Sequence, residues 1–424
     1  MTLVVVGSSL AGLRAVEAAR REGFAGEIVL IGAERHLAYD RPALSKAYLV
    51  TGEPVRHFQT VQVLRDDLQV DVRLGVTATG LDPAAKIVRT STGVVPYDTL
   101  VIATGAAPRV PPDIPALDGV LALRTMEDAA ALRELLHPGT RVLVLGAGFI
   151  GSEVASSSRQ LGAVPTVIDS APVPLVRAVG TDIGRALASL HMRNGTPLRL
   201  ATAVEEFIGR DRVEGVRLTT GEILPADLVV VGVGAAPATG WLTECGIELD
   251  PRDHGIVCDA YLRTSLPDVF AAGDVAHWPN ADLGATMRLE NWTNASAQGA
   301  HAGTNAVTPD AMTPYRTVPY FWSDWYGQRI QFVGTGAGDD VEFVSGGPDE
   351  ERFIAAVWQG DRLVGAAALN EPRKVMKLRR LIALRGTRQD VRELLDPVPQ
   401  AVGFAGREES LPSVSGTTSE RRQS

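Results

Sequence analysis

Cysteine is scarce in this sequence of 424 residues, which contains only Cys245 and Cys258. Their spacing fits neither a CxxC redox pair nor a zinc knuckle. The 7 histidines are scattered, and no two of them show HxxxH or a similar spacing of metal ligands. We therefore expect no metal site, and we expect surface or packing roles for the histidines.

Long apolar runs are missing as well. No stretch of about 18 uncharged apolar residues occurs, so we expect no segment that spans a membrane. The first residues enter an apolar, strand-like stretch directly, without the basic region, apolar segment and cleavage site of a secretory signal. We expect a cytoplasmic protein.

Positive charge is in deficit, because 41 Lys and Arg stand against 50 Asp and Glu and give a net charge of −9. This balance argues against nucleic acid as the main partner, although it leaves room for a local basic patch. Hydrophobic residues make up 45% and charged residues 21%, which is typical of a globular protein with an ample core. The length predicts two or three domains.

A complete dinucleotide fingerprint lies at residues 141–162, where Gly146, Gly148 and Gly151 separate an apolar strand from a helix. The first glycine permits the tight turn, the second lets backbone N–H groups approach a pyrophosphate, and the third lets helix and strand pack closely. The positive end of the helix dipole then faces the phosphates. The alternative is a glycine turn that serves packing alone.

Asp169 ends the strand that follows this helix. A carboxylate at that place can accept hydrogen bonds from both ribose hydroxyls and repels a 2′-phosphate. No Arg or Lys occurs between residues 170 and 176 to favour NADP. The sequence therefore predicts a site that prefers NADH.

A second, imperfect fingerprint opens the chain at residues 4–21. Gly7 and Gly12 keep the turning and packing glycines, whereas Ser9 replaces the glycine that clears room for the phosphates. Serine is small and its hydroxyl can donate to a phosphate oxygen, and Glu34 follows the next strand as the acid. We expect this loop to bind a slightly shifted pyrophosphate; an empty Rossmann-like unit is the alternative.

Two such units predict two dinucleotides, one held permanently and one exchanged. The predicted fold class is α/β, with two Rossmann-like dinucleotide-binding domains, the second inserted in the first, and a C-terminal α+β domain. The first domain is expected over 1–110 and 242–314, the inserted one over 111–241 and the C-terminal one over 315–400. Residues 401–424 are rich in Ser, Gly, Glu and Arg and are expected to form a disordered tail.

Further motifs accompany the two loops. They are YDRPALSKAYL at 39–49, ATG at 103–105, LRTMEDA at 123–129, GAGFIGSE at 146–153, GVGAAP at 232–237, FAAGDVA at 270–276 and RLENWTNASAQG at 288–299. Together they resemble the FAD-dependent ferredoxin reductases of bacterial Rieske oxygenases and cytochromes P450, within the pyridine-nucleotide-disulfide reductase fold. The resemblance covers about residues 1–400. It implies FAD and NADH as cofactors and an acidic 2Fe–2S ferredoxin as partner.

The resemblance also implies roles for single residues. Arg41 would face the pyrophosphate, Lys46 and Arg124 would lie near the flavin, and Asp274 would bind the ribityl chain. Trp292 would open the helix that points at the pyrimidine end of the flavin, where a helix dipole stabilises negative charge. The full set of implied or predicted cofactor-binding residues is Gly7, Ser9, Leu10, Ala11, Gly12, Glu34, Arg41, Lys46, Ala78, Ala103, Thr104, Gly105, Arg124, Gly146, Gly148, Phe149, Ile150, Gly151, Asp169, Gly232, Gly234, Gly273, Asp274, Glu290, Asn291 and Trp292.

The chain departs from the family pattern at Ser9 and at Ala33, where relatives often carry Asp. Disulfide reductases of this fold need cysteine beside the flavin, but the segment 42–46 reads Pro-Ala-Leu-Ser-Lys. Without a thiolate acceptor, electrons must leave the flavin for another protein. Lys46 and Glu153 are the expected catalytic pair near nicotinamide and flavin; the alternative for Glu153 is a structural salt bridge.

A basic, helical segment at 373–385 is the expected docking face for the acidic ferredoxin. Its cations are Arg373, Lys374, Lys377, Arg379, Arg380 and Arg385. The alternative is an ordinary solvated helix surface. Trp322, in the aromatic segment 321–326, lies near the electron exit or in the core of the third domain.

Three other functions stay open at this point. The same fold carries other NADH:acceptor reductases, such as rubredoxin reductase or the flavoprotein component of nitrite reductase. It also carries flavoproteins that resemble apoptosis-inducing factor, in which NADH binding is a signal. A nucleotide-binding structural protein is the third alternative.

Overall fold

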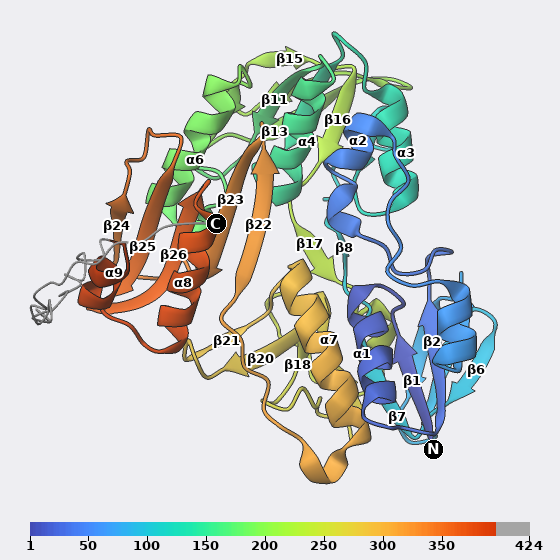
Figure 1. The fold of residues 1–424 in the computed structure, drawn as a ribbon. Helices are drawn as coiled ribbons and strands as arrows, with labels where there is room; N and C mark the ends of the chain where they lie inside the picture. Colours follow the sequence, from blue (N-terminus) through green and yellow to red (C-terminus); the bar gives the residue numbers. More distant parts are fainter. Residues whose placement is uncertain (396–424) are drawn as a thin grey trace, which may run out of the picture.

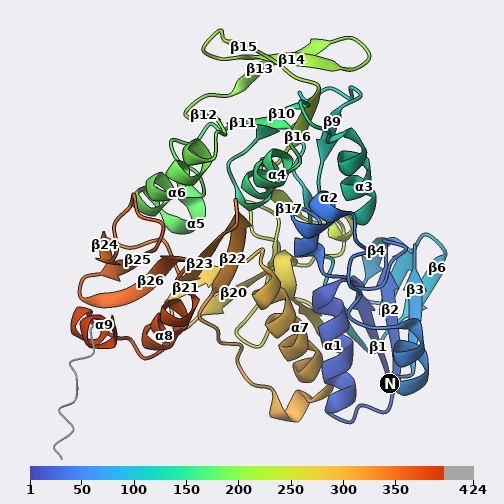
Figure 2. The ribbon, with the colours of Figure 1, turned by 45° about the horizontal axis from the view of Figure 1, so that its top comes forward.

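The computed structural model describes residues 1–395, and Figures 1 and 2 show three regions around a central junction. The disordered tail expected at 401–424, and the last residues of the expected C-terminal domain, lie outside the described part. Within residues 1–395, no helix has the length and apolar character that a bilayer crossing requires.

The first region is built on a parallel sheet with strand order β19-β7-β1-β2-β3. Its strands are β1 (Thr2–Val6), β2 (Glu27–Gly32), β3 (Val70–Leu74), β7 (Thr99–Ile102) and β19 (Val269–Ala271). The strands are short apolar runs, as expected where helices cover a sheet on both faces. Because β19 comes from far along the sequence, the chain leaves this sheet and returns to complete it.

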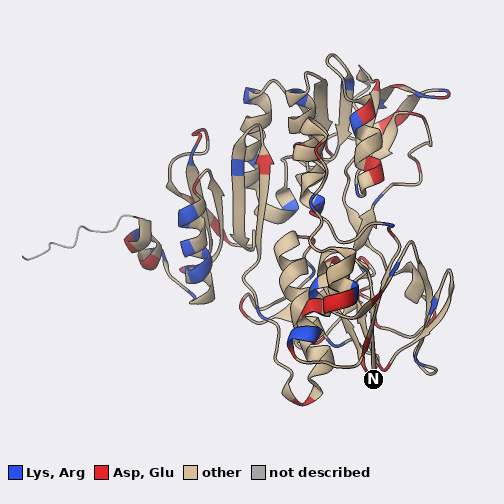
Figure 3. Cartoon of the chain, turned by 45° about the vertical axis from the view of Figure 1, so that its right-hand side comes forward, with Lys and Arg blue, Asp and Glu red and all other residues tan. Residues whose placement is uncertain are grey.

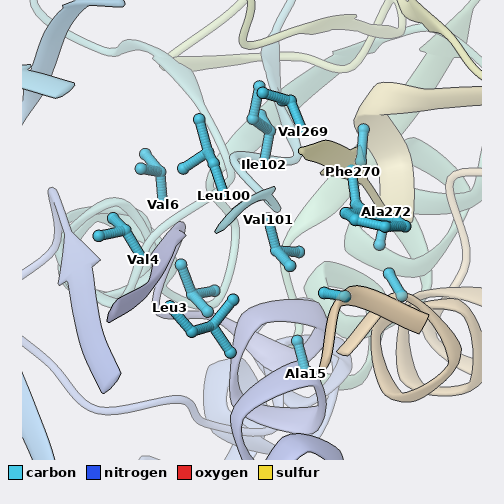
Figure 4. Close-up of a cluster of buried hydrophobic side chains, with 14 of the residues drawn as sticks. Leu3, Val4, Val6, Ala15, Leu100, Val101, Ile102, Val269, Phe270 and Ala272 are labelled. Carbon is cyan, nitrogen blue, oxygen red and sulfur yellow. The ribbon is translucent and has the colours of Figure 1, made fainter. Parts of the chain in front are cut away.

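Two helices, α1 (Leu10–Arg21) and α7 (Trp292–Val307), lie side by side on this sheet (Figures 1 and 2). They approach closely because glycine faces backbone: a Cβ at Gly299 would lie 2.2 Å from the Ala11 oxygen. Figure 4 shows the packed core beneath, where Leu3, Val101 and Phe270 come from different strands. This packing carries the start of α7 to the start of α1, where the first glycine loop lies.

Two small antiparallel sheets complete the first region. One contains β4 (Ala78–Asp82), β5 (Ile87–Thr90) and β6 (Gly93–Pro96), and the other contains β20 (Ala276–Asn280) and β21 (Ala285–Met287), with β18 (Ile256–Val257) added in parallel. The short helix α2 (Ala47–Thr51) leads away from the sheet towards the second region.

The second region is also built on a parallel sheet, with strand order β12-β11-β10-β16-β9. Its strands are β9 (Val120–Ala122), β10 (Arg141–Leu145), β11 (Val164–Ile168), β12 (Leu198–Arg199) and β16 (Leu228–Val231). Its helices are α3 (Met126–Leu135), α4 (Phe149–Gln160), α5 (Val176–Val179) and α6 (Thr181–Arg193). An antiparallel sheet of β13 (Val204–Gly209), β14 (Val213–Leu218) and β15 (Ile223–Pro225) packs on its other face.

Two short strands join the first and second regions. β8 (Ala106–Pro108) leaves the first sheet, β17 (Ala235–Pro237) returns from the second, and the two pair in antiparallel register. The chain therefore leaves the first region and returns to it through two neighbouring strands, as expected for a domain inserted into another. The domain boundaries at 110 and 242 stay a prediction.

The third region is an antiparallel sheet with strand order β22-β23-β26-β25-β24. Its strands are β22 (Tyr320–Trp325), β23 (Gln328–Gly334), β24 (Asp340–Ser345), β25 (Phe353–Gln359) and β26 (Arg362–Leu369), followed by α8 (Pro372–Ala383) and α9 (Arg388–Leu395). Apolar residues of α8 pack on one face, and α6 of the second region packs on the other. The third region is thus anchored to the second, and β22 lies beside the junction (Figure 1).

Candidate active site

A cavity of about 750 Å³ lies where the three regions meet. This volume is within the range of about 300–1,000 Å³ that small-molecule and cofactor sites occupy. The residues predicted for the site that line it are Gly7, Ser9, Leu10, Ala11, Glu34, Arg41, Lys46, Ala78, Ala103, Thr104, Gly105, Arg124, Phe149, Ile150, Glu153, Asp274, Glu290, Asn291 and Trp292. Segments separated by hundreds of residues therefore form one wall.

The other predicted residues lie behind this wall or beyond it. They are Gly12, Gly146, Gly148, Gly151, Asp169, Gly232, Gly234 and Gly273, none of which lines the cavity. The cavity is thus formed mainly by the first region, and the second region contributes the segment from the end of β9 into α3 and the first residues of α4. Each residue's part in binding stays a prediction.

The first glycine loop has the geometry of a phosphate-binding turn. Gly7 has φ +114°, and a Cβ there would lie 2.1 Å from the Ala103 oxygen; a Cβ at Gly12 would lie 1.8 Å from the Gly7 oxygen. Ser9 starts α1 with φ −81°, a conformation that any residue adopts. Its hydroxyl accepts only a long hydrogen bond of 3.3 Å from Arg41. The serine therefore fits without strain, and its oxygen remains accessible to a ligand on the cavity wall.

The second loop repeats this geometry. A Cβ at Gly146 would lie 2.3 Å from the Gly232 oxygen, and one at Gly151 would lie 2.0 Å from the Gly146 oxygen. At Gly148, by contrast, the closest atom to a Cβ would be 4.0 Å away. Protein packing therefore leaves open space at Gly148, beside the N-terminus of α4, where backbone N–H groups can receive phosphate oxygens.

Glu34 and Arg41 form an ion pair on the cavity wall, with Arg41 Nη2 2.6 Å from Glu34 Oε1. The Tyr39 hydroxyl donates to the other carboxylate oxygen at 2.7 Å, and burial raises the pKa of this phenol, so it stays a donor. Arg41 is also tied to the Arg124 backbone oxygen at 2.6 Å. A fixed carboxylate beside a fixed guanidinium suits a ribose next to a pyrophosphate.

Asp169 is held differently. Its carboxylate accepts hydrogen bonds from the backbone N–H groups of Ala147, at 2.6 Å, and Ala171, at 2.7 Å. One of these donors belongs to the second glycine loop, so the carboxylate fixes that loop. β11 ends at Ile168, one residue before Asp169, which the sequence placed at the end of this strand, because the chain turns here to bring Asp169 back to the loop.

Lys46 and Glu153 meet on the cavity wall, as the sequence predicts. The Lys46 Nζ lies 2.7 Å from Glu153 Oε2, and the carboxylate residue is only 5% exposed. The pairing joins the first region to α4 of the second. Its catalytic role stays a prediction.

The far end of the cavity is formed by Asp274 and the start of α7. Arg124 Nη2 lies 3.2 Å from Asp274 Oδ2, and Arg288 donates to the Asp274 backbone oxygen at 2.8 Å. Asn291 caps α7 by accepting from the Asn294 N–H at 2.9 Å. The Trp292 indole nitrogen is buried on this wall without a protein partner. An unpaired donor beside a helix N-terminus fits the oxygen-rich pyrimidine ring of a flavin, so the residues present fit FAD.

Several residues that line the cavity were not predicted from the sequence. They are Ser8, Ser45, Thr77, Asp128, Trp241, Ala295 and Phe321. Ser45 lies inside the YDRPALSK motif and Phe321 inside the aromatic segment, so the sequence contained a local indication that both belong to the site. Trp241 had none, because nothing local links it to the glycine loops. Trp322, whose place the sequence left open, does line the cavity, with its ring centroid 5.9 Å from that of Trp292.

Figure 3 colours the positions of Lys and Arg blue, and several of them gather on the ribbon of α8. The exposed or half-exposed cations are Arg373, Lys374, Lys377 and Arg380. Arg379 was wrongly placed on this face: it lies half-buried, donates to the Val318 oxygen at 2.9 Å and covers the Tyr320 ring at 5.7 Å. Arg385 lies beyond the helix, which ends at Ala383.

One cluster away from the cavity has the composition of a metal site. Asp250, Asp253 and His277 place potential ligand atoms within 4.8 Å of one another. Both carboxylates are already paired with guanidinium groups, Asp250 with Arg252 at 2.8 Å and Asp253 with Arg288 at 2.6 Å. We interpret the cluster as a structural ion-pair network.

Two glycine loops on two parallel sheets, with a shared cavity between them, define an oxidoreductase that brings two dinucleotides together. The chain belongs to the pyridine nucleotide-disulphide oxidoreductase family, which matches residues 1–299. Residues 320–401 match the family described as reductase C-terminal. The chain is accordingly an FAD-dependent oxidoreductase that uses NAD(H).

Curated relatives match almost the whole chain. Rhodocoxin reductase of Rhodococcus erythropolis is 35% identical over 389 residues, which cover 90% of this chain and 90% of the relative. The ferredoxin–NAD(+) reductase component of the anthranilate 1,2-dioxygenase system of Burkholderia cepacia is 38% identical over 405 residues, covering 93% and 97%.

Solved structures agree with these relatives. The covalent putidaredoxin reductase–putidaredoxin complex matches with a TM-score of 0.87 and 28% identity, covering 93% of this chain and 98% of that chain. The ferredoxin reductase for the CYP199A2 system from Rhodopseudomonas palustris matches with a TM-score of 0.86 and 32% identity, covering 91% and 95%. The predicted fold class is thereby confirmed.

Proposed function

We propose that this chain is an NADH-dependent ferredoxin reductase, which passes electrons from NADH through FAD to a 2Fe–2S ferredoxin serving a cytochrome P450 or a Rieske oxygenase. The relatives support this proposal, because their names contain rhodocoxin reductase and a dioxygenase-system ferredoxin–NAD(+) reductase component. A structural neighbour joins a reductase to its putidaredoxin.

The observation that carries the proposal is a cavity wall without a thiol. Among the described residues, no cysteine lines the cavity, and both cysteines lie buried in the core of the first region. Burial raises the pKa of the Cys258 thiol, so it does not supply a reactive thiolate. Electrons that enter the cavity therefore have no cysteine acceptor and leave to another molecule.

FAD, when bound, takes two electrons as hydride from NADH and releases them one at a time. The first glycine loop, Glu34 and Arg41 would hold its adenosine diphosphate half, and the N-terminus of α7 would face its ring. The second loop would bring NADH to the side of the cavity formed by α4. Phe149 and Phe321, whose ring centroids are 4.5 Å apart, lie on that side and would exclude water there.

The same proposal assigns the remaining regions. Residues 1–110 with 242–314 would form the FAD-binding domain, 111–241 the NADH-binding domain and 315–400 the C-terminal domain. The exposed cations of α8 would steer the acidic ferredoxin towards the cavity. The location would be the cytoplasm, where two unpaired cysteines stay reduced.

The test is electron delivery from NADH to candidate 2Fe–2S ferredoxins, followed through cytochrome c with and without the ferredoxin. We expect cytochrome c reduction to depend on one ferredoxin and to weaken with ionic strength. Charge reversal at Lys374 and Lys377 should lower the ferredoxin-dependent rate, whereas the control Arg185→Glu on α6 should not. The proposal is contradicted if the rate of cytochrome c reduction is the same with and without every candidate ferredoxin.

A further inference from the structure

The Glu153 carboxylate is surrounded by hydrogen-bond donors from three parts of the chain. Its Oε2 receives the Ser45 hydroxyl at 2.5 Å and the Lys46 ammonium at 2.7 Å. Its Oε1 receives the Ser323 hydroxyl at 2.5 Å. Ser45 and Lys46 belong to the first region, Glu153 to α4 of the second and Ser323 to β22 of the third.

The direction of the Ser323 hydrogen bond follows from its neighbour. The indole nitrogen of Trp325 lies 2.8 Å from the Ser323 oxygen, and an indole N–H can only donate. Ser323 therefore accepts from Trp325, and its single proton is directed to Glu153. Since Lys46 also only donates, both oxygens of Glu153 act as acceptors, which is the arrangement of an ionised carboxylate.

The residues that form this arrangement are buried, so a lost hydrogen bond to Glu153 is not easily replaced by water. Ser323 and Trp325 are 0% exposed, and Glu153 and Ser45 are each 5% exposed. A buried carboxylate is costly unless its oxygens are hydrogen-bonded, and water has little access to replace a missing donor. The donor on Oε1 comes from the third region through Ser323.

The fixed carboxylate in turn fixes Lys46. The ammonium group has three N–H bonds, of which one is directed to Glu153 and another to the Pro42 oxygen at 3.0 Å. One N–H remains for a ligand in the cavity that Lys46 lines. The direction of that N–H depends on the place of the Glu153 carboxylate.

The strand β22 is suited to this task because its two faces have different contacts. Phe321 contacts Phe149 of α4 on the face that carries Ser323, and the Tyr326 N–H next to the strand donates to Ser156 of α4 at 2.6 Å. On the opposite face, Trp322 lies against Trp292 at the start of α7. One strand of the third region thus contacts both sides of the cavity.

We propose that Ser323 is a positioning residue for hydride transfer: it orients the Glu153 carboxylate, which holds Lys46 towards the reacting rings. This inference rests on the proposed function, in which the Lys46–Glu153 pair lies beside nicotinamide and flavin. The third region thereby completes the NADH side of the site, in addition to its proposed part in docking.

The test is anaerobic stopped-flow reduction of the bound FAD by NADH in Ser323→Ala, without any acceptor protein. We expect the rate constant at saturating NADH to fall about tenfold, as for the loss of one hydrogen bond to a charged group. The apparent dissociation constant of NADH should change less than about twofold, and the FAD content and visible spectrum should stay unchanged. This split separates positioning from binding.

Three further variants make the result decisive. In a Glu153→Gln background, Ser323→Ala should have little further effect, because both changes act on one carboxylate. Ser158→Ala removes another buried serine of α4, whose hydroxyl has no hydrogen-bond partner among the described residues, and it should keep the parental rate. If Ser323→Ala loses FAD, Ser45→Ala tests the same carboxylate from the other side and should slow flavin reduction.

The inference is overturned if Ser323→Ala is reduced at the parental rate, if its effect adds fully to that of Glu153→Gln, or if Ser158→Ala slows the reaction as much. If Ser323→Ala loses FAD, the variant to measure is Ser45→Ala, and its reduction by NADH at the parental rate overturns the inference. Failure of the proposed function is seen separately: the parental chain would be reduced by NADH and would still pass no electrons to any ferredoxin.

Discussion

The two glycine loops share their first and third glycines and differ in the middle. In both loops a Cβ at the first glycine would lie 2.1–2.3 Å from a backbone oxygen of the neighbouring strand end, and one at the third would lie 1.8–2.0 Å from the oxygen of the first. The middle position is Ser9 in one loop, where Arg41 makes a long contact of 3.3 Å, and Gly148 in the other, where the closest atom to a Cβ would be 4.0 Å away. Packing thus requires the first and the last glycine of each loop, and the ligand determines the residue in the middle.

The acids that follow the loops differ as well. Glu34 is held by the side chains of Arg41 and Tyr39 on the cavity wall, whereas Asp169 is held by backbone N–H groups and lies outside the cavity. The first unit therefore presents prearranged side chains to its ligand along a deep cavity. The second unit presents a stiff backbone loop at the cavity's edge. This difference fits one nucleotide that stays and one that exchanges.

The largest expected effect comes from adding a methyl group to the third glycine of each loop. Gly12→Ala would place a Cβ 1.8 Å from the Gly7 oxygen, and Gly151→Ala would place one 2.0 Å from the Gly146 oxygen. Each should cost more than about 3 kcal/mol, at the upper end of overpacking. Purified Gly12→Ala should lack FAD absorbance, whereas Gly151→Ala should keep it and lose reduction by NADH. The comparison fails if both variants lose the same nucleotide.

A buried histidine makes the second unit sensitive to acid. His191 on α6 lies between the Tyr326 hydroxyl, at 2.8 Å, and the Ser152 hydroxyl, at 3.2 Å, and burial lowers its pKa from 6.5 to about 4. Between these values the unfolded chain binds a proton that the folded chain does not, so stability falls as the pH falls. From pH 7.5 to 5 the loss should be about 2 kcal/mol.

Denaturant unfolding at a series of pH values checks this prediction. His191→Gln should flatten the pH dependence by that amount, whatever its stability at pH 7.5. His137→Gln, which changes an exposed loop residue of the same unit, should leave the slope unchanged. An unaltered slope in His191→Gln would contradict the assignment.

The next effect compares the two acids. Asp169→Asn directs an amide N–H₂ group towards one of two backbone donors, Ala147 or Ala171, so one N–H loses its acceptor. We expect a loss of about 1–2 kcal/mol in stability and a weaker affinity for NADH. Glu34→Gln meets side chains that can rearrange, so its stability should change less while FAD retention falls. Equal stability losses measured by thermal unfolding would remove the distinction.

The smallest effects are expected at the middle positions. Ser9→Gly removes only a 3.3 Å contact from Arg41 and should change the thermal stability by less than about 1 kcal/mol. Gly148→Ser has open space, with the closest atom 4.0 Å away, and should be equally mild for stability. In NADH titrations, however, Gly148→Ser should raise the apparent dissociation constant, because its side chain enters the ligand's space. An unchanged constant would show that this loop needs no glycine in the middle.

Much of the architecture could be predicted because its signals are local. The strand–glycine–helix pattern located both parallel sheets, α7 begins at Trp292, where the family resemblance places it, and α8 begins one residue before the helical segment expected at 373–385. The buried face of α8 was also visible in principle. Arg379 lies one turn from Val375 and one residue from Leu378, both buried, so the helical period places it near the core.

The serine contacts of Glu153 could not be predicted in the same way. Ser323 and Glu153 are separated by 170 residues, and a serine in a strand carries no periodic signal for its partner. The polarity of α4, which holds Ser152, Ser156 and Ser157 on buried positions, is explained only by what packs on it. Long-range polar contacts depend on the assembled fold, whereas glycine turns depend on a few neighbouring residues.

One measurement tests the contrast between a held and an exchanging nucleotide most directly. The purified chain is treated with one equivalent of NADH without air, followed at the visible flavin bands, and then passed through a desalting column. We predict that one NADH per FAD bleaches the flavin, that FAD stays with the protein at one per chain, and that the pyridine nucleotide elutes with small molecules. A chain without visible flavin absorbance, or a flavin that does not bleach, would contradict the account.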